Sequence, residues 1–213
     1  MINDERITTF INSFDTGLSK ELAELEKYAK ETNVPIIRPQ MQNLMKVLLK
    51  IKEPVRILEV GCAIGFSALL MAEYGPQNCQ ITTIEKYEKR IPIARENFKK
   101  FGREKQITLL EGDAIDILKE LQGEYDLIFM DAAKGQYINF LPDILRLLAP
   151  KGILLSDNVL QDGNVMESRF AVVRRDRTIH GRMRDYLYEL KNHPELMTDI
   201  LPVGDGVTIS VKI

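Results

Sequence analysis

The sequence RILEVGCAIGFS, residues 56–67, decides the fold of this chain. Its first five residues are mostly apolar and predict a buried strand, and the glycines at positions 61 and 65 predict a tight turn. Ser67 then stands in the first turn of a predicted helix, where backbone N–H groups lack partners. A strand, a glycine turn and a helix in this order are typical of the ligand-binding edge of an open α/β sheet.

Two later apolar runs, residues 127–130 and 153–155, each lead into polar side chains. Runs of this length between turn residues are typical of buried parallel strands. Asp131 follows the first run, and Asp157 with Asn158 follows the second after one serine. Because the carboxyl ends of parallel strands meet at one edge of a sheet, these side chains are predicted to lie together.

Strand and helix signals alternate through the rest of the chain. The expected strands span residues 56–60, 80–84, 107–110, 127–130 and 153–156, and the expected helices span about 66–74, the residues before 102, those after 113, and 138–148. This alternation predicts a parallel, doubly wound sheet. The C-terminal residues 196–203 and 207–213, around Gly204-Asp205-Gly206, instead predict an antiparallel hairpin.

A helical prefix is expected before the sheet, in residues 1–52. Apolar residues recur at helical spacing over 4–30, with Gly17 as a break, and again over 41–49 after a proline-containing connector at 33–39. With no internal repeat and no linker, the whole of residues 1–213 is predicted to form one domain, whose sheet-forming core is 53–213.

The composition is that of an ordinary globular protein, with 45% hydrophobic and 28% charged residues. A net charge of -2 gives no general attraction to nucleic acid, so such a partner would need a local basic patch. Cys62 and Cys79 fit neither a disulfide framework nor a zinc site. The N-terminal residues lack a signal-peptide pattern and no apolar run approaches roughly 18 residues, so a cytoplasmic protein without a membrane partner is expected.

Acidic residues near the glycine turn indicate the kind of cofactor. Glu85 follows the next expected strand, at the position about 20 residues beyond the turn where a ribose-binding carboxylate is expected. The turn reads G-x-x-x-G rather than G-x-G-x-x-G, and Glu59 before it would repel a pyrophosphate, which favours S-adenosylmethionine over a dinucleotide. Gly61 and Gly65 could instead serve only close packing of strand and helix. Asp113 reads as a helix N-cap and is compatible with a site for adenine.

The second acidic group suggests metal-assisted chemistry. Asp131, Asp157 and Asn158 offer three oxygen ligands without thiolates or clustered histidines, which favours Mg²⁺ or Ca²⁺ over zinc. Lys134 lies three residues after Asp131, so it is predicted to stand at the same strand edge, where it could act as a base. Alternatively, Asp131 and Asp157 could be helix caps and Lys134 a solvated loop lysine. Three oxygens converging on one edge disfavour this interpretation. A cation chelated by adjacent substrate oxygens would suit a catechol or a 5-hydroxyuracil, held in line with a methyl donor.

Taken in order, these motifs resemble the class I S-adenosylmethionine-dependent O-methyltransferases of the metal-dependent catechol and caffeoyl-CoA O-methyltransferase family. The resemblance covers nearly the whole chain and implies a Rossmann-like, mostly parallel seven-stranded sheet, Mg²⁺ or Mn²⁺ as the metal, and a homodimer. It implies that Asp131, Asp157 and Asn158 bind the metal and that Lys134 and Asp131 are the catalytic residues. The cofactor contacts that it implies are Met41, Glu59, Gly61, Ala63, Ser67, Glu85, Asp113, Ala114 and Asp131.

An arginine-rich segment at residues 169–184 points to the substrate. Its six arginines are Arg169, Arg174, Arg175, Arg177, Arg182 and Arg184, and Arg38 is expected to extend the patch. Ile179, Met183 and Tyr186 fall on the predicted apolar face of a helix, which leaves many arginines available for phosphates. The arrangement resembles the bacterial tRNA 5-hydroxyuridine methyltransferases, which implies methylation of 5-hydroxyuridine at the anticodon wobble position to 5-methoxyuridine.

Other interpretations remain open. The basic segment could be a solvated helix or a subunit contact. The substrate could be a small catechol-like or hydroxycinnamoyl-type compound, because the same metal ligands would serve it. A non-catalytic cofactor-binding or RNA-binding module is disfavoured by the complete ligand set and by Lys134.

Overall fold

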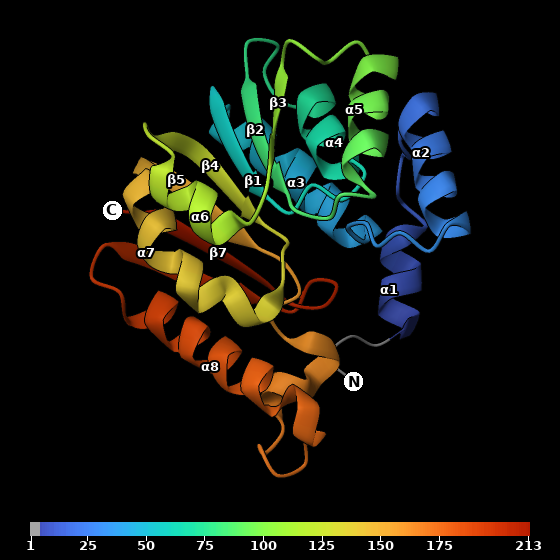
Figure 1. The fold of residues 1–213 in the computed structure, drawn as a ribbon. Coiled ribbons are helices and arrows are strands. Elements are labelled where there is room, and N and C mark those ends of the chain that lie inside the picture. Colours follow the sequence, from blue (N-terminus) through green and yellow to red (C-terminus); the bar gives the residue numbers. More distant parts are fainter. Residues whose placement is uncertain (1–4) are drawn as a thin grey trace.

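The computed structural model describes residues 5–213, which form a sheet covered by helices on both faces (Figure 1). Within these residues the sheet holds seven strands in the order β3-β2-β1-β4-β5-β7-β6. The strands are β1 Arg56–Val60, β2 Gln80–Glu85, β3 Ile107–Glu111, β4 Tyr125–Met130, β5 Leu148–Ser156, β6 Leu196–Leu201 and β7 Val207–Lys212. Strands β1 to β5 are parallel, while β7 is antiparallel to both β5 and β6. The predicted fold, including its C-terminal hairpin, is confirmed.

The helices divide between two hydrophobic cores, one on each face of the sheet. The first core takes its side chains from α2 Lys20–Glu31, α3 Pro39–Lys52, α4 Phe66–Tyr74 and α5 Ile91–Lys100. The second takes them from α6 Ala114–Glu120, α7 Tyr137–Leu147 and α8 Arg177–Asn192. Helix α1, Glu5–Asn12, lies at the edge of the molecule below α2, and three short 3-10 helices complete the chain: η1 Lys134–Gln136, η2 Gln161–Met166 and η3 Arg174–Asp176.

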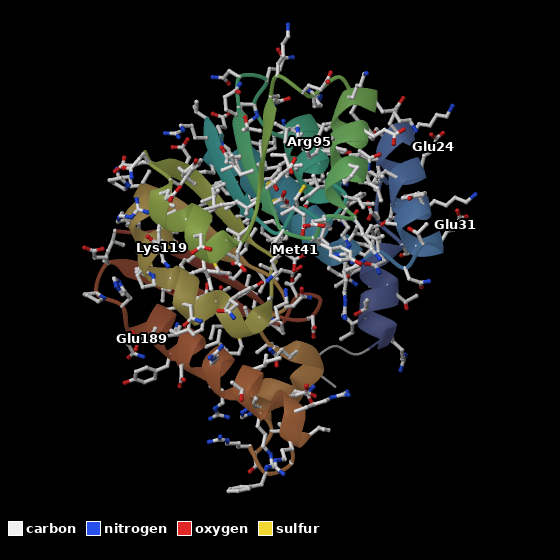
Figure 2. The ribbon with its side chains drawn as sticks, in the orientation of Figure 1. Glu24, Glu31, Met41, Arg95, Lys119 and Glu189 are labelled. Atoms are coloured by element: carbon white, nitrogen blue, oxygen red, sulfur yellow. The ribbon has the colours of Figure 1, made fainter. Side chains whose placement is uncertain are left out.

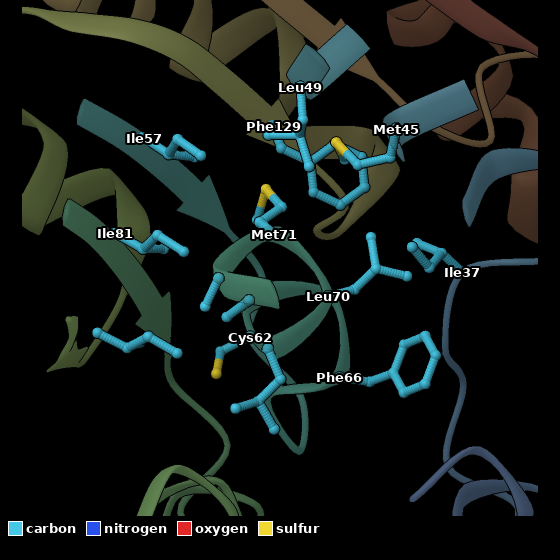
Figure 3. Close-up of a cluster of buried hydrophobic side chains, with 14 of the residues drawn as sticks. Ile37, Met45, Leu49, Ile57, Cys62, Phe66, Leu70, Met71, Ile81 and Phe129 are labelled. Atoms are coloured by element: carbon cyan, nitrogen blue, oxygen red, sulfur yellow. The ribbon is translucent and has the colours of Figure 1, made fainter. Parts of the chain in front are cut away.

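Helix α4 is the most enclosed element of the first core. All of its residues from Phe66 to Ala72 are buried, so it has no polar face. In Figure 3, Met71 lies towards the strand residues Ile57 and Ile81, while Leu70 lies towards the connector residue Ile37. Charged residues such as Glu24, Glu31, Lys119 and Glu189 point outwards in Figure 2. The sheet edge that follows β1 is therefore anchored to a rigid, apolar helix.

Two boundaries differ from the sequence-based expectation. The break in the prefix spans residues 13–19 rather than Gly17 alone, because the Ser19 hydroxyl caps α2 by accepting the Leu22 N–H. Strand β5 begins at Leu148, directly after α7, whereas the apolar run predicted it only from about residue 153. Leu148 pairs with Tyr125, and an irregularity in the β4–β5 register absorbs the intervening residues. No helix among residues 5–213 has both the length and the apolarity needed to cross a bilayer.

Candidate active site

The candidate site forms where three neighbouring strands end in register. Val60 of β1 pairs with Met130 of β4, and Met130 pairs with Ser156 of β5. Adjacent strands in a sheet lie about 4.8 Å apart, so the residues that follow these three leave the sheet side by side. The next residues along the chain are Gly61, Asp131 and Asp157. The structure thus brings the glycine turn and both acidic motifs to one edge, as the sequence predicts.

A cavity of about 520 Å³ opens at this edge, within the size range of small-molecule sites. Most of the residues expected in the site line it: Arg38, Gly61, Ala63, Ser67, Glu85, Asp113, Ala114, Asp131, Lys134, Asp157 and Asn158. Two basic residues not expected from the sequence, Lys86 and Arg90, line it as well. Met41 and Glu59 do not belong to this lining, since both are fully buried behind it.

Glu59 acts on the cavity through its neighbours. Its carboxylate accepts hydrogen bonds from the hydroxyls of Ser67, which lines the cavity, and Thr83, which is fully buried. Burial, opposed by these two donors, raises the pKa of Glu59 to about 7. Glu59 therefore does not face the cavity, as the expected repulsion of a pyrophosphate would require, whereas Glu85 does line it. Thr83 was not predicted from the sequence, although it stands opposite Glu59 in the β1–β2 register.

The two glycines of the turn are required by packing. Gly61 and Gly65 both have positive φ angles, of 107° and 85°. A Cβ at Gly61 would overlap the backbone carbonyl of Asp131, and one at Gly65 would overlap the ring of Phe98. Close packing thus explains both residues, and Gly61 in addition lines the cavity. Because Gly61 has no side chain, the turn after β1 lies directly against the acidic residue that follows β4.

Glu85 and Asp113 mark the other end of the cavity. Glu85 accepts the Ala63 N–H at 2.7 Å with one oxygen and two backbone N–H groups of the next residues with the other. The oxygen that accepts from Ala63 has a second lone pair, so the carboxylate can still accept from a ribose hydroxyl. Asp113 caps α6 through the Ile115 N–H at 3.0 Å, and this bond, with Lys86 beside it, lowers its pKa. The cap predicted from sequence is therefore present at the cavity wall.

The oxygen atoms at this edge determine which metal the site could hold. Among the described residues no three His, Cys, Asp or Glu side chains gather closely enough to hold an ion. Asp131 and Asp157 would therefore need the amide oxygen of Asn158 as a third protein ligand, and two carboxylates with an amide suit Mg²⁺, which keeps several waters. Asp157 is 3% exposed, and burial, together with the charge of Asp131, raises its pKa to about 6. These residues fit a hard divalent cation.

Lys134 is held in place between two partners. Its Nζ donates to Asp131 Oδ1 at 2.7 Å and to the Tyr137 hydroxyl at 3.1 Å. The Tyr137 hydroxyl in turn lies 3.0 Å from the Met130 carbonyl and 3.2 Å from that of Asp157. Burial raises the pKa of Tyr137 well above its ordinary value, so this hydroxyl keeps its proton. Tyr137 was not predicted from sequence, although its spacing of three from Lys134 places both on one helical face.

A second hollow of about 600 Å³ adjoins the first. The two share Ala133, Lys134, Gln136 and Asn158, and the outer hollow is otherwise lined by Gly135, Gln161, Asn164, Val172, Asp176, Ile179, Arg182 and Asp205. Four of these residues belong to the segment from Val172 to Arg182. The basic segment predicted from sequence therefore forms one wall of the hollow next to Lys134.

The arginines of this segment have different environments. Arg169, Arg174, Arg175, Arg182 and Arg184 are exposed or partly exposed, whereas Arg177 is half-buried and donates to the Val172 carbonyl. The apolar face of α8 includes Met183 and Tyr186 as predicted, but Ile179 is exposed and His180 is buried instead. The Nε2 atom of the buried His180 ring lies 3.1 Å from the Glu167 carbonyl, while its Nδ1 has no hydrogen-bond partner among the described residues. Arg38, from the connector before α3, lies 4.0 Å from Asp205.

Comparison with known proteins agrees with this architecture. A profile of the family described as O-methyltransferase matches residues 12–213. Caffeoyl-CoA O-methyltransferase 2 of Populus trichocarpa is 31% identical over 209 residues, covering 91% of this chain and 81% of that protein. Catechol O-methyltransferase of Niastella koreensis is 33% identical over 143 residues, 64% of this chain and 65% of that protein.

The structural comparison gives the same family. The crystal structure of the SAH-bound Podospora anserina methyltransferase PaMTH1 has a TM-score of 0.88 and 30% sequence identity, covering 98% of this chain and 94% of that one. The likeness extends over the prefix, the sheet and the hairpin rather than over the nucleotide-binding edge alone. The chain therefore belongs to the O-methyltransferase family, as a class I S-adenosylmethionine-dependent enzyme of the caffeoyl-CoA and catechol type.

Proposed function

We propose that this enzyme methylates the 5-hydroxyl of 5-hydroxyuridine at the wobble position of tRNA anticodons, with Mg²⁺ or Mn²⁺ as its metal. The observation that carries the proposal is the position of the basic segment. Val172, Asp176 and Arg182 line the same hollow as Lys134, and the segment that supplies them also carries the exposed Arg169, Arg174, Arg175 and Arg184. A substrate base in this hollow would have its phosphates near those arginines.

The inner cavity and the outer hollow would each bind one of the two substrates. S-adenosylmethionine would occupy the inner cavity, with its ribose at Glu85 and its adenine near Asp113 and Ala114. Ser67, held by Glu59, would stand beside its methionine part. The base would be extruded from the anticodon loop into the outer hollow, as enzymes that modify bases require. The residues that the two spaces share, Lys134 and Asn158 among them, would then lie between donor and acceptor.

The reaction assigns a role to each group at this junction. Asp131, Asp157 and Asn158 would hold the cation, which when bound is a Lewis acid that favours the ionised substrate hydroxyl. Lys134, in its neutral form, would take the proton of the 5-hydroxyl, and Tyr137 would hold its amine in place. The oxygen then forms the new bond to the methyl carbon while the electrons of the sulfur–carbon bond return to sulfur, which releases neutral S-adenosylhomocysteine.

Mass spectrometry of tRNA nucleosides tests the substrate. In cells that lack this protein, 5-methoxyuridine should disappear and 5-hydroxyuridine should accumulate, and the gene supplied in trans should reverse both changes. Purified enzyme should convert hydroxylated tRNA, lose activity with a chelator and regain it with added Mg²⁺ or Mn²⁺. Undiminished 5-methoxyuridine in the deleted cells would reject the proposed substrate, and chelator-resistant turnover would reject the metal.

A small phenolic substrate is the second candidate function. It is favoured by the relatives, which carry the names catechol O-methyltransferase and caffeoyl-CoA O-methyltransferase. The same metal ligands and Lys134 would serve a vicinal diol. A simple catechol would offer the exposed arginines no phosphate, whereas the coenzyme A part of a thioester would. Parallel assays of one enzyme preparation with a catechol, a caffeoyl thioester and hydroxylated tRNA separate the two candidates by their kcat/KM values.

A further inference from the structure

The loop that joins η2 to η3 displays apolar side chains to solvent. Phe170 is 85% exposed, the largest exposed fraction of any large apolar side chain in the part of the chain that the structure describes. Met166 and Val173, on either side of it, are 64% and 63% exposed. In Figure 1 this loop is the orange projection at the bottom of the molecule, beyond the end of α8. An aromatic ring placed at such a tip contributes nothing to the core of the chain.

The projection is nevertheless firmly held. Three side chains of α8, those of Arg177, His180 and Arg184, contact backbone carbonyls of the loop and of η2 before it. The carbonyls belong to Val165, Glu167, Phe170 and Val172, at distances of 3.1–3.4 Å. The Ala171 N–H also closes a turn on the Ser168 carbonyl at 2.8 Å. Phe170 is therefore presented on an ordered loop, which lowers the entropy cost of placing its ring against a partner.

The charges around the ring indicate the chemistry of that partner. Arg169 precedes Phe170, and Arg174 and Arg175 follow it within five residues; all three are exposed. Arg175 also lies 3.6 Å from Asp176. Exposed arginines close in sequence to one exposed aromatic ring match a strand in which negatively charged phosphates alternate with flat bases. The other side of the same loop faces the active site, because Val172 lines the hollow next to Lys134.

We propose that Phe170 stacks on an unpaired nucleobase of the RNA substrate that flanks the nucleotide entering the hollow. This inference rests on the proposed tRNA function and adds to it a recognition residue outside the methyl-transfer site. Aromatic rings recognise single-stranded RNA by stacking without sequence readout, while the neighbouring arginines contact phosphates. The loop would then hold the anticodon strand at two points, the methylated base and its stacked neighbour.

The absence of tryptophan from this chain gives a direct probe. In Phe170→Trp the single indole should be quenched when a tRNA anticodon stem-loop binds, and inorganic polyphosphate, which carries charge without bases, should leave its emission unchanged. The matched control is Tyr188→Trp, because Tyr188 is an aromatic residue of α8 that is also exposed, at 66%. Its emission should not change with RNA. Binding itself is followed independently by the fluorescence anisotropy of a labelled stem-loop.

Alanine variants separate stacking from charge. Phe170→Ala should weaken stem-loop binding by roughly 5- to 150-fold without changing its salt dependence, since a stacked base contributes through its ring. The double variant Arg174→Ala with Arg175→Ala should instead reduce the salt dependence. Calorimetric binding of S-adenosylmethionine should stay unchanged in both, which verifies that each variant is folded.

The outcomes distinguish this inference from the function on which it rests. If the stem-loop binds while the indole of Phe170→Trp remains unquenched, stacking is wrong and the tRNA function stands. If the parent protein binds no stem-loop, both the stacking inference and the proposed tRNA function are wrong. If Phe170→Ala changes the sedimentation coefficient rather than RNA affinity, the ring is a contact between protein chains and the inference is overturned.

Discussion

Glu59 is an ionisable residue with no exposure to solvent, and its ionisation is linked to folding. Burial, opposed by hydrogen bonds from Ser67 and Thr83, raises its pKa from 4.5 to about 7, with the charges of Asp131 and Glu85 acting in the same direction. The folded chain therefore binds this proton more tightly than the unfolded chain. The stability that Glu59 contributes is fully present below about pH 4.5 and is lost as the pH rises through about 7.

Replacing Glu59 by glutamine should remove this pH dependence. Glutamine keeps the shape of the side chain and can still accept a hydrogen bond, so Glu59→Gln should gain stability relative to the parent between about pH 5 and pH 8. The gain in the free energy of unfolding should be on the order of 3 kcal/mol, measured by urea denaturation at each pH. Glu24→Gln, at a residue that points outwards in Figure 2, is the control. If the unfolding free energies of the two variants change with pH in the same way, the pH dependence does not come from the buried carboxyl of Glu59.

Lys134 offers the most direct test of catalysis at a single residue. Lys134→Met retains the length of the side chain but cannot accept a proton, so turnover should fall by about 10²- to 10⁴-fold. S-adenosylmethionine affinity, measured by calorimetry, should change little. Tyr137→Phe loses the 3.1 Å contact with Lys134 but keeps the base, so its turnover should fall less. Near-normal turnover of Lys134→Met would exclude this lysine as the base.

The turn between β6 and β7 supports the loop that follows β5. The Val159 N–H donates to the Gly206 carbonyl at 2.9 Å, and the Leu160 N–H donates to the Asp205 carbonyl at 3.0 Å. Gly206 has a φ of 86°, and a Cβ there would overlap the side chain of Leu160. The C-terminal hairpin thus fixes the backbone directly after Asn158, at the proposed metal site.

Gly206→Ala should therefore weaken both the fold and the metal site. The clash adds to the strain of a positive φ, and together they should cost about 2–4 kcal/mol of unfolding free energy. Gly17→Ala is a matched control, because Gly17 has a similar φ of 82° but open space around it. Gly17→Ala should lose only about 1 kcal/mol of unfolding free energy. Urea denaturation measures the unfolding free energy of both variants, and Mn²⁺ affinity should fall in Gly206→Ala alone. Equal losses of unfolding free energy in the two variants would rule out the clash with Leu160.

The elements show why some boundaries are predictable and others are not. Strand ends at Val60, Met130 and Ser156 follow from sequence because an apolar run stops where a polar or glycine turn begins. The start of β5 does not, since Leu148 enters the sheet only through its pairing with Tyr125 and a shift in register. Such pairing depends on a partner strand that is distant in sequence, and no local pattern records it.

The meeting of strand carboxyl ends at one sheet edge predicts which residues gather, but not how deep each one lies. Asp131 and Asp157 were expected together, and they line one cavity. Glu59 and Met41 were expected to contact the cofactor, yet both lie behind the cavity wall. Alternation along β1 directs Glu59 to one face of the sheet, and only the packing of α3 and α4 over that face decides whether the carboxyl reaches the cavity.

Helix α1 gives the prediction that concerns the molecule as an assembly. The apolar side chains of this helix and of Phe14 after it, namely Ile7, Phe10, Ile11 and Phe14, are 56–69% exposed. The rings of Phe10 and Phe14 are 5.0 Å apart and form one patch. Because a two-fold axis brings identical patches together, we expect a second copy of the chain to cover this one.

Sedimentation should accordingly show a particle of twice the chain mass for the parent protein. The variant Phe10→Ser with Phe14→Ser should convert it to monomers, because it removes the centre of the patch while both positions remain solvent-exposed within a single chain. Met197→Ser, at a residue of β6 that is 70% exposed, should leave the dimer intact. A dimer that survives the double variant would place the interface elsewhere, and a monomeric parent would mean that α1 covers a different partner.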